Sequence, residues 1–386
     1  MKITKLTTFH IPEYPLSMFL RVDTDEGLYG LGESTNQPLV AACAVHDFCA
    51  PEALGRDCGE IELIWRRLYE KVNLQGSAGA EMRALSALDF ALWDLLGKAC
   101  KKPLWQLLGG KVRDRVAIYN TCGTHNGRIR SRPDDEWFRE DAGTLAEDLL
   151  KSGIHAMKIW PLDRFSRATN GQSISEADIR AGFLPLKKIR DAVGDDMQIC
   201  LELHSLWNLP SAIRIAKEAE RYNVKWIEDP ILVDDVGNLR RLREKISVPL
   251  LASERLCSMA QYLPLLSCGG ADIVMVDLSW MGGLTEGKKV AALADAFRLP
   301  VTTHNCGGPV LTKACAHFNL ATYNAIEMET VRASYWSFPE ITDTDFDIKD
   351  GSIFPGDAPG LGLEFHGDIL GRDGVTSRVS GRGHGG

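Results

Sequence analysis

The stretch KWIEDP at residues 225–230 decides the fold, because it joins a short apolar run directly to an acidic side chain. Short apolar runs of this kind are typical of buried strands in a parallel sheet. Seven similar runs lie along the chain, with amphipathic helical segments between them, at 116–119, 156–159, 198–201, 249–252, 273–276, 300–303 and 324–326. Eight alternating strand and helix units predict an α/β fold in which the strands close into a (β/α) barrel.

An ionisable side chain lies at or just after the end of six of these runs. The steps between successive side chains are 26, 26, 23, 27 and 25 residues, which is close to one strand–helix unit each. Because the active site of such a barrel lies at the C-terminal ends of its strands, we expect the six side chains to surround one cavity. They are Glu202, Glu228, Glu254, Asp277, His304 and Glu329.

Glu202, Glu228 and Glu254 follow three consecutive strands and offer carboxylate oxygens alone. Three such groups cannot all be ionised close together without a cation, and oxygen ligands suit a hard divalent ion. We therefore predict a Mg²⁺ site, since Mg²⁺ also keeps water positions open for a substrate. The alternative is that the three acids make unrelated surface salt bridges, which their shared spacing disfavours.

Two histidines are candidate acid–base groups. Asp277 ends the strand before His304, and a carboxylate behind an imidazole fixes its tautomer and raises its basicity, as a general base requires. His204 lies two residues after Glu202, so along a strand it faces the same side and is a candidate acid across the pocket. The alternative is that His204 merely lines the mouth or bonds a loop.

Three further side chains complete the predicted rim. Lys158 ends the second strand, where a cation favours a bound carboxylate, and Trp160 is expected to form an apolar wall. Glu329, if a raised pKa keeps it protonated, is a possible donor to the same carboxylate. This set suits removal of the proton α to a carboxylate, because the developing enediolate charge needs a metal and cationic donors.

Composition excludes several classes of protein. The 386 residues carry a formal net charge of −8 without a Lys/Arg-rich run, which disfavours nucleic-acid binding. No apolar stretch approaches the ~20 residues that span a bilayer, and no signal peptide is evident. Ten scattered cysteines without a Cys-x-x-Cys pair are typical of reduced thiols in a cytoplasmic protein.

Sequence motifs along almost the whole chain resemble those of the enolase superfamily, mandelate racemase subgroup. They are GLGE at 30–33, ALDFALWD at 87–94, PLWQLLGG at 103–110, WIEDP at 226–230, LASER at 251–255, VDLSWMGGLTE at 276–286 and PGLG at 359–362. Within this subgroup the chain is most similar to acid-sugar dehydratases of the galactonate type.

The resemblance implies a modified, TIM-like (β/α) barrel beneath an N-terminal α+β capping domain. It also implies Mg²⁺ at the three glutamates, a general-base dyad of His304 with Asp277, Glu329 on the substrate carboxylate, and His204 as the general acid. From about residue 116 the sequence changes to short apolar runs that alternate with amphipathic segments. We therefore predict a capping domain at 1–115 and the barrel at 116–330. A segment at 331–371 is predicted to return to the cap, and the tail at 372–386 to be disordered.

Two departures from the family pattern bear on the reaction. Glu202 stands where the first metal ligand is usually Asp, and Trp160 stands where racemases of this subgroup carry a second, basic lysine. The missing lysine favours a Mg-dependent dehydratase that converts an aldonate or aldarate to a 2-keto-3-deoxy acid sugar. The alternatives are an epimerase, racemase or cycloisomerase using the same enediolate, and a non-catalytic, metal-stabilised binding protein.

Substrate contacts are expected from loops of the cap and from the barrel mouth. The long interval after the second strand contains Asp163, Arg164 and Arg167, which could reach the site. We expect a small sugar-acid substrate, no nucleic-acid or membrane partner, and a homo-oligomer. The candidates for contact with distal hydroxyls are Glu13, Tyr14, Gln75, His125, Asn126 and Trp336, each of which is alternatively an ordinary surface or packing residue.

Overall fold

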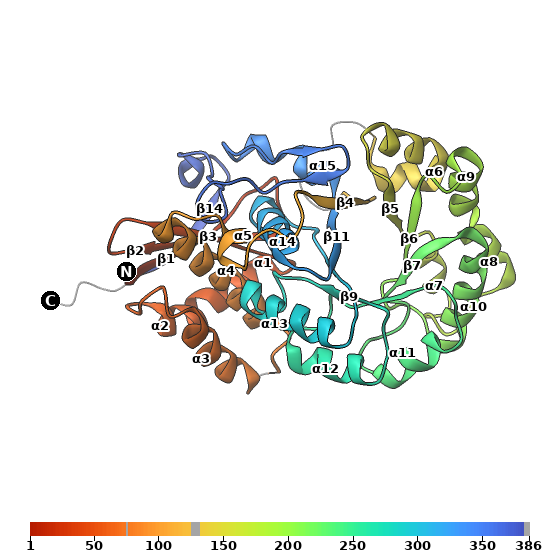
Figure 1. Cartoon of the computed structure of the whole chain (residues 1–386), viewed down its shortest axis with the longest axis horizontal. Coiled ribbons are helices and arrows are strands. Elements are labelled where there is room, and N and C mark those ends of the chain that lie inside the picture. Colours follow the sequence, from red (N-terminus) through yellow and green to blue (C-terminus); the bar gives the residue numbers. More distant parts are fainter. Residues whose placement is uncertain (75, 125–131, 382–386) are drawn as a thin grey trace.

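The computed structural model of the chain describes residues 1–74, 76–124 and 132–381 (Figure 1). Eight parallel strands form a barrel, which β11 closes by pairing with β4. The predicted α/β barrel is therefore confirmed, and each of the eight predicted runs overlaps one of its strands. The strands are β4 (Val116–Thr121), β5 (Ala156–Ile159), β6 (Gln198–Glu202), β7 (Val224–Glu228), β8 (Leu250–Ala252), β9 (Ile273–Val276), β10 (Val301–Thr303) and β11 (Ala325–Thr330).

Helices cover the outside of the barrel, and two units depart from the regular repeat. Three helices follow β5, where the long interval had predicted an extra loop, whereas β11 is followed by the four-residue α15. The helices are α6 (Asp134–Lys151), α7 (Asp163–Ser166), α8 (Glu176–Gly182), α9 (Leu184–Val193), α10 (Leu209–Ala219), α11 (Val236–Arg243), α12 (Met259–Ser267), α13 (Gly283–Ala296), α14 (Pro309–Ala321) and α15 (Arg332–Tyr335).

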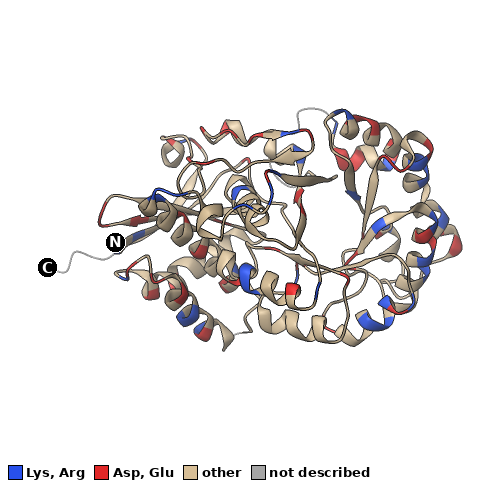
Figure 2. Cartoon of the chain, in the orientation of Figure 1, with Lys and Arg blue, Asp and Glu red and all other residues tan. Residues whose placement is uncertain are grey.

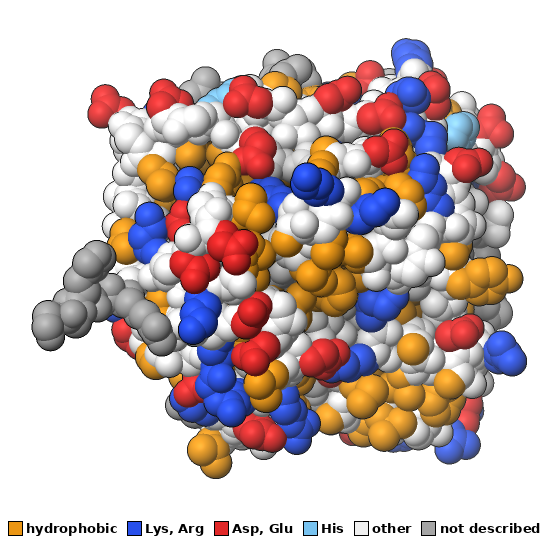
Figure 3. Space-filling view, turned by 60° about the vertical axis from the view of Figure 1, so that its left-hand side comes forward, with side chains coloured by type: hydrophobic (Ala, Val, Ile, Leu, Met, Phe, Trp, Pro, Cys, Tyr) orange, Lys and Arg blue, Asp and Glu red, His pale blue; other side chains and the backbone are white. Residues whose placement is uncertain are grey.

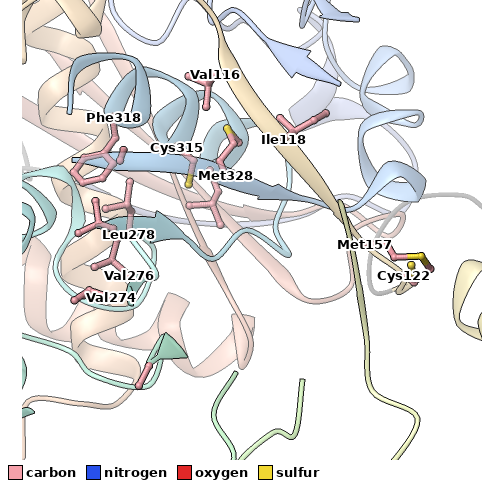
Figure 4. Packing of buried hydrophobic residues seen from close by; sticks show 14 of the residues in the cluster. Val116, Ile118, Cys122, Met157, Val274, Val276, Leu278, Cys315, Phe318 and Met328 are labelled. Carbon is pink, nitrogen blue, oxygen red and sulfur yellow. The ribbon is translucent and has the colours of Figure 1, made fainter. Parts of the chain in front are cut away.

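Alternation along the strands divides the buried side chains into two layers. Val274 and Val276 of β9 pack in the cluster between strands and helices, while Met275 between them belongs to a small cluster with Trp226. In Figure 4, Met328 of β11 lies close to Cys315 of α14 within the first layer. The strands are thus held by apolar contacts on both faces, which leaves their C-terminal ends for polar groups.

The N-terminal region forms the predicted α+β capping domain. Its sheet has the order β14-β1-β2-β3, and its longest helix, α4, packs on β3. The packing is close because a Cβ at Gly30 or Gly32 would lie about 2 Å from a carbonyl oxygen of α4. The elements are β1 (Ile3–His10), β2 (Ser17–Thr24), β3 (Tyr29–Thr35), α1 (Pro38–Ala44), α2 (Ala50–Ala53), α3 (Ile61–Asn73), α4 (Ala80–Cys100) and α5 (Leu104–Leu107).

Buried polar contacts fix the cap over the barrel. Asp89 of α4 accepts a hydrogen bond from the Thr285 amide at 3.0 Å, at the start of α13. Glu33 at the end of β3 accepts hydrogen bonds from the amides of Gly308 and Leu311, which are donors without helical partners at the N-terminus of α14. The cap is therefore anchored to the helices that follow β9 and β10, beside the predicted catalytic strands.

The C-terminal segment corrects one prediction. Residues 372–386 were expected to be disordered, but Thr376–Gly381 forms strand β14, which pairs antiparallel with β1 from His10↔Thr376 to Lys5↔Gly381. The side chains of β14 are mostly exposed, so the strand needs no apolar pattern in its sequence. Backbone hydrogen bonds to the edge of β1 hold it in place, and not burial of apolar side chains. Two other short strands, β12 (Ile348–Lys349) and β13 (Ser352–Ile353), extend the barrel sheet at β4.

Charged residues lie mainly on the helices and loops around the barrel (Figure 2). On the face in Figure 3, acidic and basic side chains are interspersed, with hydrophobic patches between them. Among the described residues, no helix combines the length and apolarity that crossing a bilayer requires.

Candidate active site

The strand ends bring the predicted polar residues to one cavity of about 430 Å³. From the barrel it is lined by Lys158, Trp160, Glu202, His204, Glu254 and His304, and from the cap by Leu16, Thr35, Asn36, Ala78 and Arg83. Glu228, Asp277 and Glu329 are fully buried next to these residues. A cavity of this size suits a small polar molecule, and its walls come from both domains.

Lys158 lies at the centre of the acidic groups. Its Nζ is 2.7 Å from Glu228 Oε1, 2.8 Å from Glu329 Oε1 and 3.5 Å from Glu202 Oε2. Burial opposes the charged ammonium, but the surrounding carboxylates outweigh it and raise the pKa of Lys158 well above its ordinary value. Lys158 therefore stays cationic and compensates part of the negative charge at the rim.

The three predicted metal ligands lie on neighbouring strand ends. Glu202 and Glu228 are aligned in the β6–β7 ladder, and burial with like-charge crowding raises the pKa of Glu228 well above its usual range. Burial also raises the pKa of Glu202 to about 7. For Glu254 burial acts in the same direction, but the positive charges of His304 and Lys158 outweigh it and lower the pKa.

Buried carboxylate oxygens that lack hydrogen-bond partners in the described part of the chain indicate that the three glutamates fit a hard divalent cation. Glu254 Oε2 and Asp229 Oδ1 are buried with no hydrogen-bond partner among the described residues, so acceptor capacity is left over beside Glu202 and Glu228. Lys158 makes ion pairs with two of the three glutamates and so balances part of their negative charge. A divalent ion would relieve the crowding that raises the pKa values of Glu202 and Glu228.

His304 and Asp277 form a fixed dyad. Nδ1 of His304 lies 2.6 Å from Asp277 Oδ2, while the other carboxylate oxygen accepts hydrogen bonds from the Ser279 amide and hydroxyl, both at 2.7 Å. Because an ionised carboxylate only accepts, Nδ1 carries a hydrogen, and when the ring is neutral the lone pair is on Nε2. The ring of Trp280 packs 5.0 Å from the imidazole and limits its rotation.

His204 reaches the same cavity by a different route from the one we expected. β6 ends at Glu202, and His204 has a left-handed backbone with φ of 47°, so strand alternation does not orient it. Its backbone amide donates to Glu202 Oε1 at 2.6 Å, and its Nδ1 lies 2.6 Å from Asp163 Oδ2. Asp163, which begins α7 in the long interval after β5, thus does reach the site and makes a second His–Asp pair.

Glu329 differs from the prediction that it could be a protonated donor. It accepts a hydrogen bond from the Asn305 amide at 2.9 Å and another from the Thr121 hydroxyl, besides its ion pair with Lys158. Burial opposes ionisation, but Lys158 and His304 outweigh it and lower the pKa of Glu329 to about 2. Glu329 is therefore an ionised acceptor, because its cationic neighbours favour the charged form.

The predicted substrate-contact residues fall into three groups. Trp160 lines the cavity, and its ring lies 5.7 Å from that of His204. Tyr14 is fully buried and its hydroxyl donates to Ser334 O, while Glu13 forms an ion pair with Arg372, so both are packing residues outside the cavity lining. Trp336 likewise packs on Arg332, at 5.1 Å, and not in the cavity. Gln75, His125 and Asn126 lie outside the described residues.

Sequence reasoning missed several cavity residues. Arg83 of α4 stacks 4.6 Å above the ring of Trp280, which in turn packs on His304. Arg83 lies on a helix of the cap and Trp280 lies four residues beyond the end of β9, so the spacing of strand ends marked neither residue. Cys306 also lines the cavity, and its position two residues after His304 matches that of His204 after Glu202, a signal that could have identified it.

Known proteins show the same two-part organisation. Residues 6–109 match "Mandelate racemase / muconate lactonizing enzyme, N-terminal domain", and residues 141–369 match "Enolase C-terminal domain-like". The chain is 32% identical over 379 residues to the D-galactonate dehydratase of Klebsiella pneumoniae (strain 342), an alignment that covers 95% of this chain and 93% of that protein.

Solved structures agree over the full length. An enolase of the mandelate racemase subgroup from Agrobacterium tumefaciens is 41% identical, with a TM-score of 0.89 and 99% of each chain covered. An enolase protein from the environmental genome shotgun sequencing of the Sargasso Sea is 38% identical, with a TM-score of 0.91, covering 99% of this chain and 100% of that one.

Proposed function

The chain belongs to the mandelate racemase and muconate lactonizing enzyme family of the enolase superfamily, and from this premise we propose that it dehydrates a sugar acid. The proposed substrate is an aldonate or aldarate, and the product is a 2-keto-3-deoxy acid sugar. The name of the Klebsiella relative, D-galactonate dehydratase, supports this class of reaction. The polar cavity, closed by the cap, supports a small hydroxylated substrate.

We propose that Glu202, Glu228 and Glu254 hold Mg²⁺. The unpartnered Glu254 Oε2 and the all-oxygen donor set support this assignment. When bound, a divalent ion supplies Lewis-acid stabilisation for negative charge that develops on a carboxylate oxygen. The Lys158 ammonium lies beside these glutamates, and its raised pKa keeps it positive for the same purpose.

His304 is proposed as the base that removes the proton from C2. Its Nδ1 hydrogen is directed at Asp277, which leaves Nε2 to accept the proton and the carboxylate to stabilise the imidazolium. The C2–H electron pair then forms the enediolate. Glu329, ionised and 3.7 Å from Nε2, further favours the protonated ring and keeps Lys158 in place.

Expulsion of the C3 hydroxyl needs a proton, and His204 is placed to give it. The C3–O bond breaks as the hydroxyl takes a proton from His204, or from His304 after abstraction, and leaves as water. The enol that remains tautomerises to the 2-keto acid. Asp163 hydrogen-bonds to the His204 ring as Asp277 does to that of His304, so each imidazole has a carboxylate partner at 2.6 Å.

One observation carries the proposal: two aspartate-backed histidines face one cavity from opposite sides. β6 and β10 are separated by three strands on either side of the closed eight-strand ring, so His204 and His304 approach the substrate from across the barrel. A base and an acid on opposed walls are what elimination of a C2 proton and a C3 hydroxyl requires.

The test is turnover of a library of aldonic and aldaric acids with Mg²⁺, assayed for 2-keto acids. We expect at least one substrate to give a 2-keto acid, with loss of turnover after chelation and recovery when Mg²⁺ is returned. A folded, Mg²⁺-loaded protein that converts no library member would overturn the dehydratase proposal.

The same pair of histidines also favours a second candidate, an epimerase. If His204 returned a proton to the opposite face of C2, the stereocentre would invert without loss of water. Recovered substrate would then contain solvent deuterium at C2 in inverted configuration, whereas a dehydratase gives a 2-keto acid with deuterium at C3.

We also infer a homo-oligomer and a cytoplasmic location. All ten cysteines lie in the described part of the chain and none forms a disulfide, which supports a reducing compartment. Sedimentation of the purified protein would test the oligomer.

A further inference from the structure

A second group of potential metal ligands, apart from the three glutamates, includes the proposed general base His304. His304, Cys306 and Glu329 each offer one ligand atom, and these three atoms lie within 4.8 Å of one another. His304 Nε2 is 3.7 Å from Glu329 Oε2, and Cys306 Sγ is 3.8 Å from Glu329 Oε1. Tetrahedral sites with bonds of about 2.0–2.3 Å place neighbouring ligands roughly 3.3–3.8 Å apart, so little movement is needed.

The surroundings of His304 are those of a metal-binding histidine. Its Nδ1 is directed at Asp277, which the Ser279 amide and hydroxyl hold in turn, and Nε2 is the ring nitrogen on the side of Glu329. A carboxylate behind the ring fixes the tautomer and raises the basicity of the ligating nitrogen. Both His304 and Cys306 line the cavity, which gives an ion from solvent a path to them.

We propose that His304 Nε2, Cys306 Sγ and a Glu329 carboxylate oxygen form a binding site for a thiophilic divalent cation, represented by Zn²⁺. The nitrogen, sulfur and oxygen set is typical of zinc, whereas the all-oxygen set of Glu202, Glu228 and Glu254 is typical of magnesium. When Sγ coordinates, its proton leaves to solvent, and the fourth position of the tetrahedron remains open to water.

The local charge balance permits such an ion. Two carboxylates, Asp277 and Glu329, flank the imidazole, and a thiolate would add a third negative charge. Lys158 opposes binding because its ammonium lies 2.8 Å from Glu329 Oε1, although the other oxygen, Oε2, is the one nearer His304. The site therefore differs from the magnesium site in ligand chemistry, with His304 on the Oε2 side of Glu329 and both Cys306 and Lys158 on the Oε1 side.

Binding here would occupy the lone pair on Nε2 that the proposed reaction requires. Zn²⁺ is thus expected to inhibit in the presence of excess Mg²⁺, a consequence that rests on the proposed function. The binding itself does not rest on it, so metal affinity and enzymatic turnover can be measured separately.

The experiment compares the full-length protein with two matched cysteine variants, Cys306→Ser and Cys257→Ser. Cys257 lines the same cavity but is outside the three-ligand group, so its replacement controls for loss of a cavity thiol. Each protein, kept in excess Mg²⁺, is titrated with Zn²⁺ by calorimetry and with Co²⁺ by absorption spectroscopy, which detects thiolate coordination. Thermal melting confirms that the variants are folded.

We expect one Zn²⁺ site and a thiolate-to-Co²⁺ band in the unchanged protein and in Cys257→Ser. In Cys306→Ser we expect the band to disappear and the affinity to fall by tenfold or more, a ligand loss comparable to the ~10–100-fold effect of removing a supporting residue. Equal Zn²⁺ affinity in Cys306→Ser, or a band lost in Cys257→Ser instead, would overturn the site. Failure to turn over any sugar acid would leave these binding results unaffected.

Discussion

The two His–Asp pairs of the cavity have the same hydrogen-bond length but very different surroundings. His304 and Asp277 stand at the ends of adjacent strands, and Asp277 is fully buried with three hydrogen bonds. His204 lies on the loop after β6 and Asp163 begins the short helix α7, and their side chains are 39% and 22% exposed. In the reaction we propose, this difference divides the work between a base fixed by the barrel, which takes the C2 proton, and an acid on a loop, which can adjust to the departing hydroxyl.

Replacing the buried base should have the largest effect. In His304→Asn we expect both 2-keto acid formation and exchange of the C2 proton to fall by about 10⁴-fold, the upper range for a general base. Rates of product formation and deuterium incorporation measure the two steps. His366→Asn is the matched control, since His366 pairs with Asp343 at 2.8 Å outside the cavity lining and should keep full activity.

Replacing the loop histidine should separate the two steps. In His204→Asn we expect dehydration to fall by about 10²-fold while exchange at C2 falls only slightly, because the base remains in place. The same two assays measure both. Parallel losses would remove the distinction between the pairs, and an unchanged dehydration rate would assign both proton transfers to His304.

The aspartates should differ in stability as well as in rate. Asp277→Asn leaves the Ser279 donors or the His304 donor without a good acceptor in a buried site, so we expect the free energy of unfolding to fall by about 1–3 kcal/mol. Asp163→Asn weakens one partly exposed contact and should cost about 0.5 kcal/mol or less. Urea unfolding of both variants checks this order; equal losses would contradict it.

The smallest expected effect is the dependence of C2 proton exchange on pH, which reports on the protonation of His304. Burial opposes protonation of His304, but Glu329 and Asp277 outweigh it and raise its pKa well above the ordinary value near 6.5. A protonated ring cannot accept the C2 proton, so exchange should decrease as pH falls through this raised pKa. NMR titration of the metal-free protein should show the shift, and Glu329→Gln should move the pKa downward. No movement in that variant would show that Glu329 does not hold the proton on His304.

The eight barrel strands and the polar residues at their ends could be predicted, because a strand is marked by residues that are neighbours in the sequence. A short apolar run closed by an ionisable residue folds the same way in each unit, so the eight strands and the positions of Glu202, Asp277 and His304 followed from periodicity. The cap was visible for a similar reason, since β2, β3 and α4 have strong local patterns.

Contacts between distant segments followed no such pattern. Tyr14 had been a candidate for substrate contact, yet packing against the segment after the barrel buries it completely. β14 has no apolar alternation of its own, and only the free edge of β1 makes it a strand. Asp163 meets His204 across 41 residues because the start of α7 and the loop after β6 converge above the strand ends.

The amino-acid sequence by itself determined which chemical groups stand at the strand ends, because strand and helix periodicity are properties of neighbouring residues. The tertiary structure decided their charge states and partners: Lys158 among three glutamates, Glu329 held ionised, and Cys306 beside the base. Burial and charge act through space between residues far apart in the chain, so these properties arise only when the barrel closes.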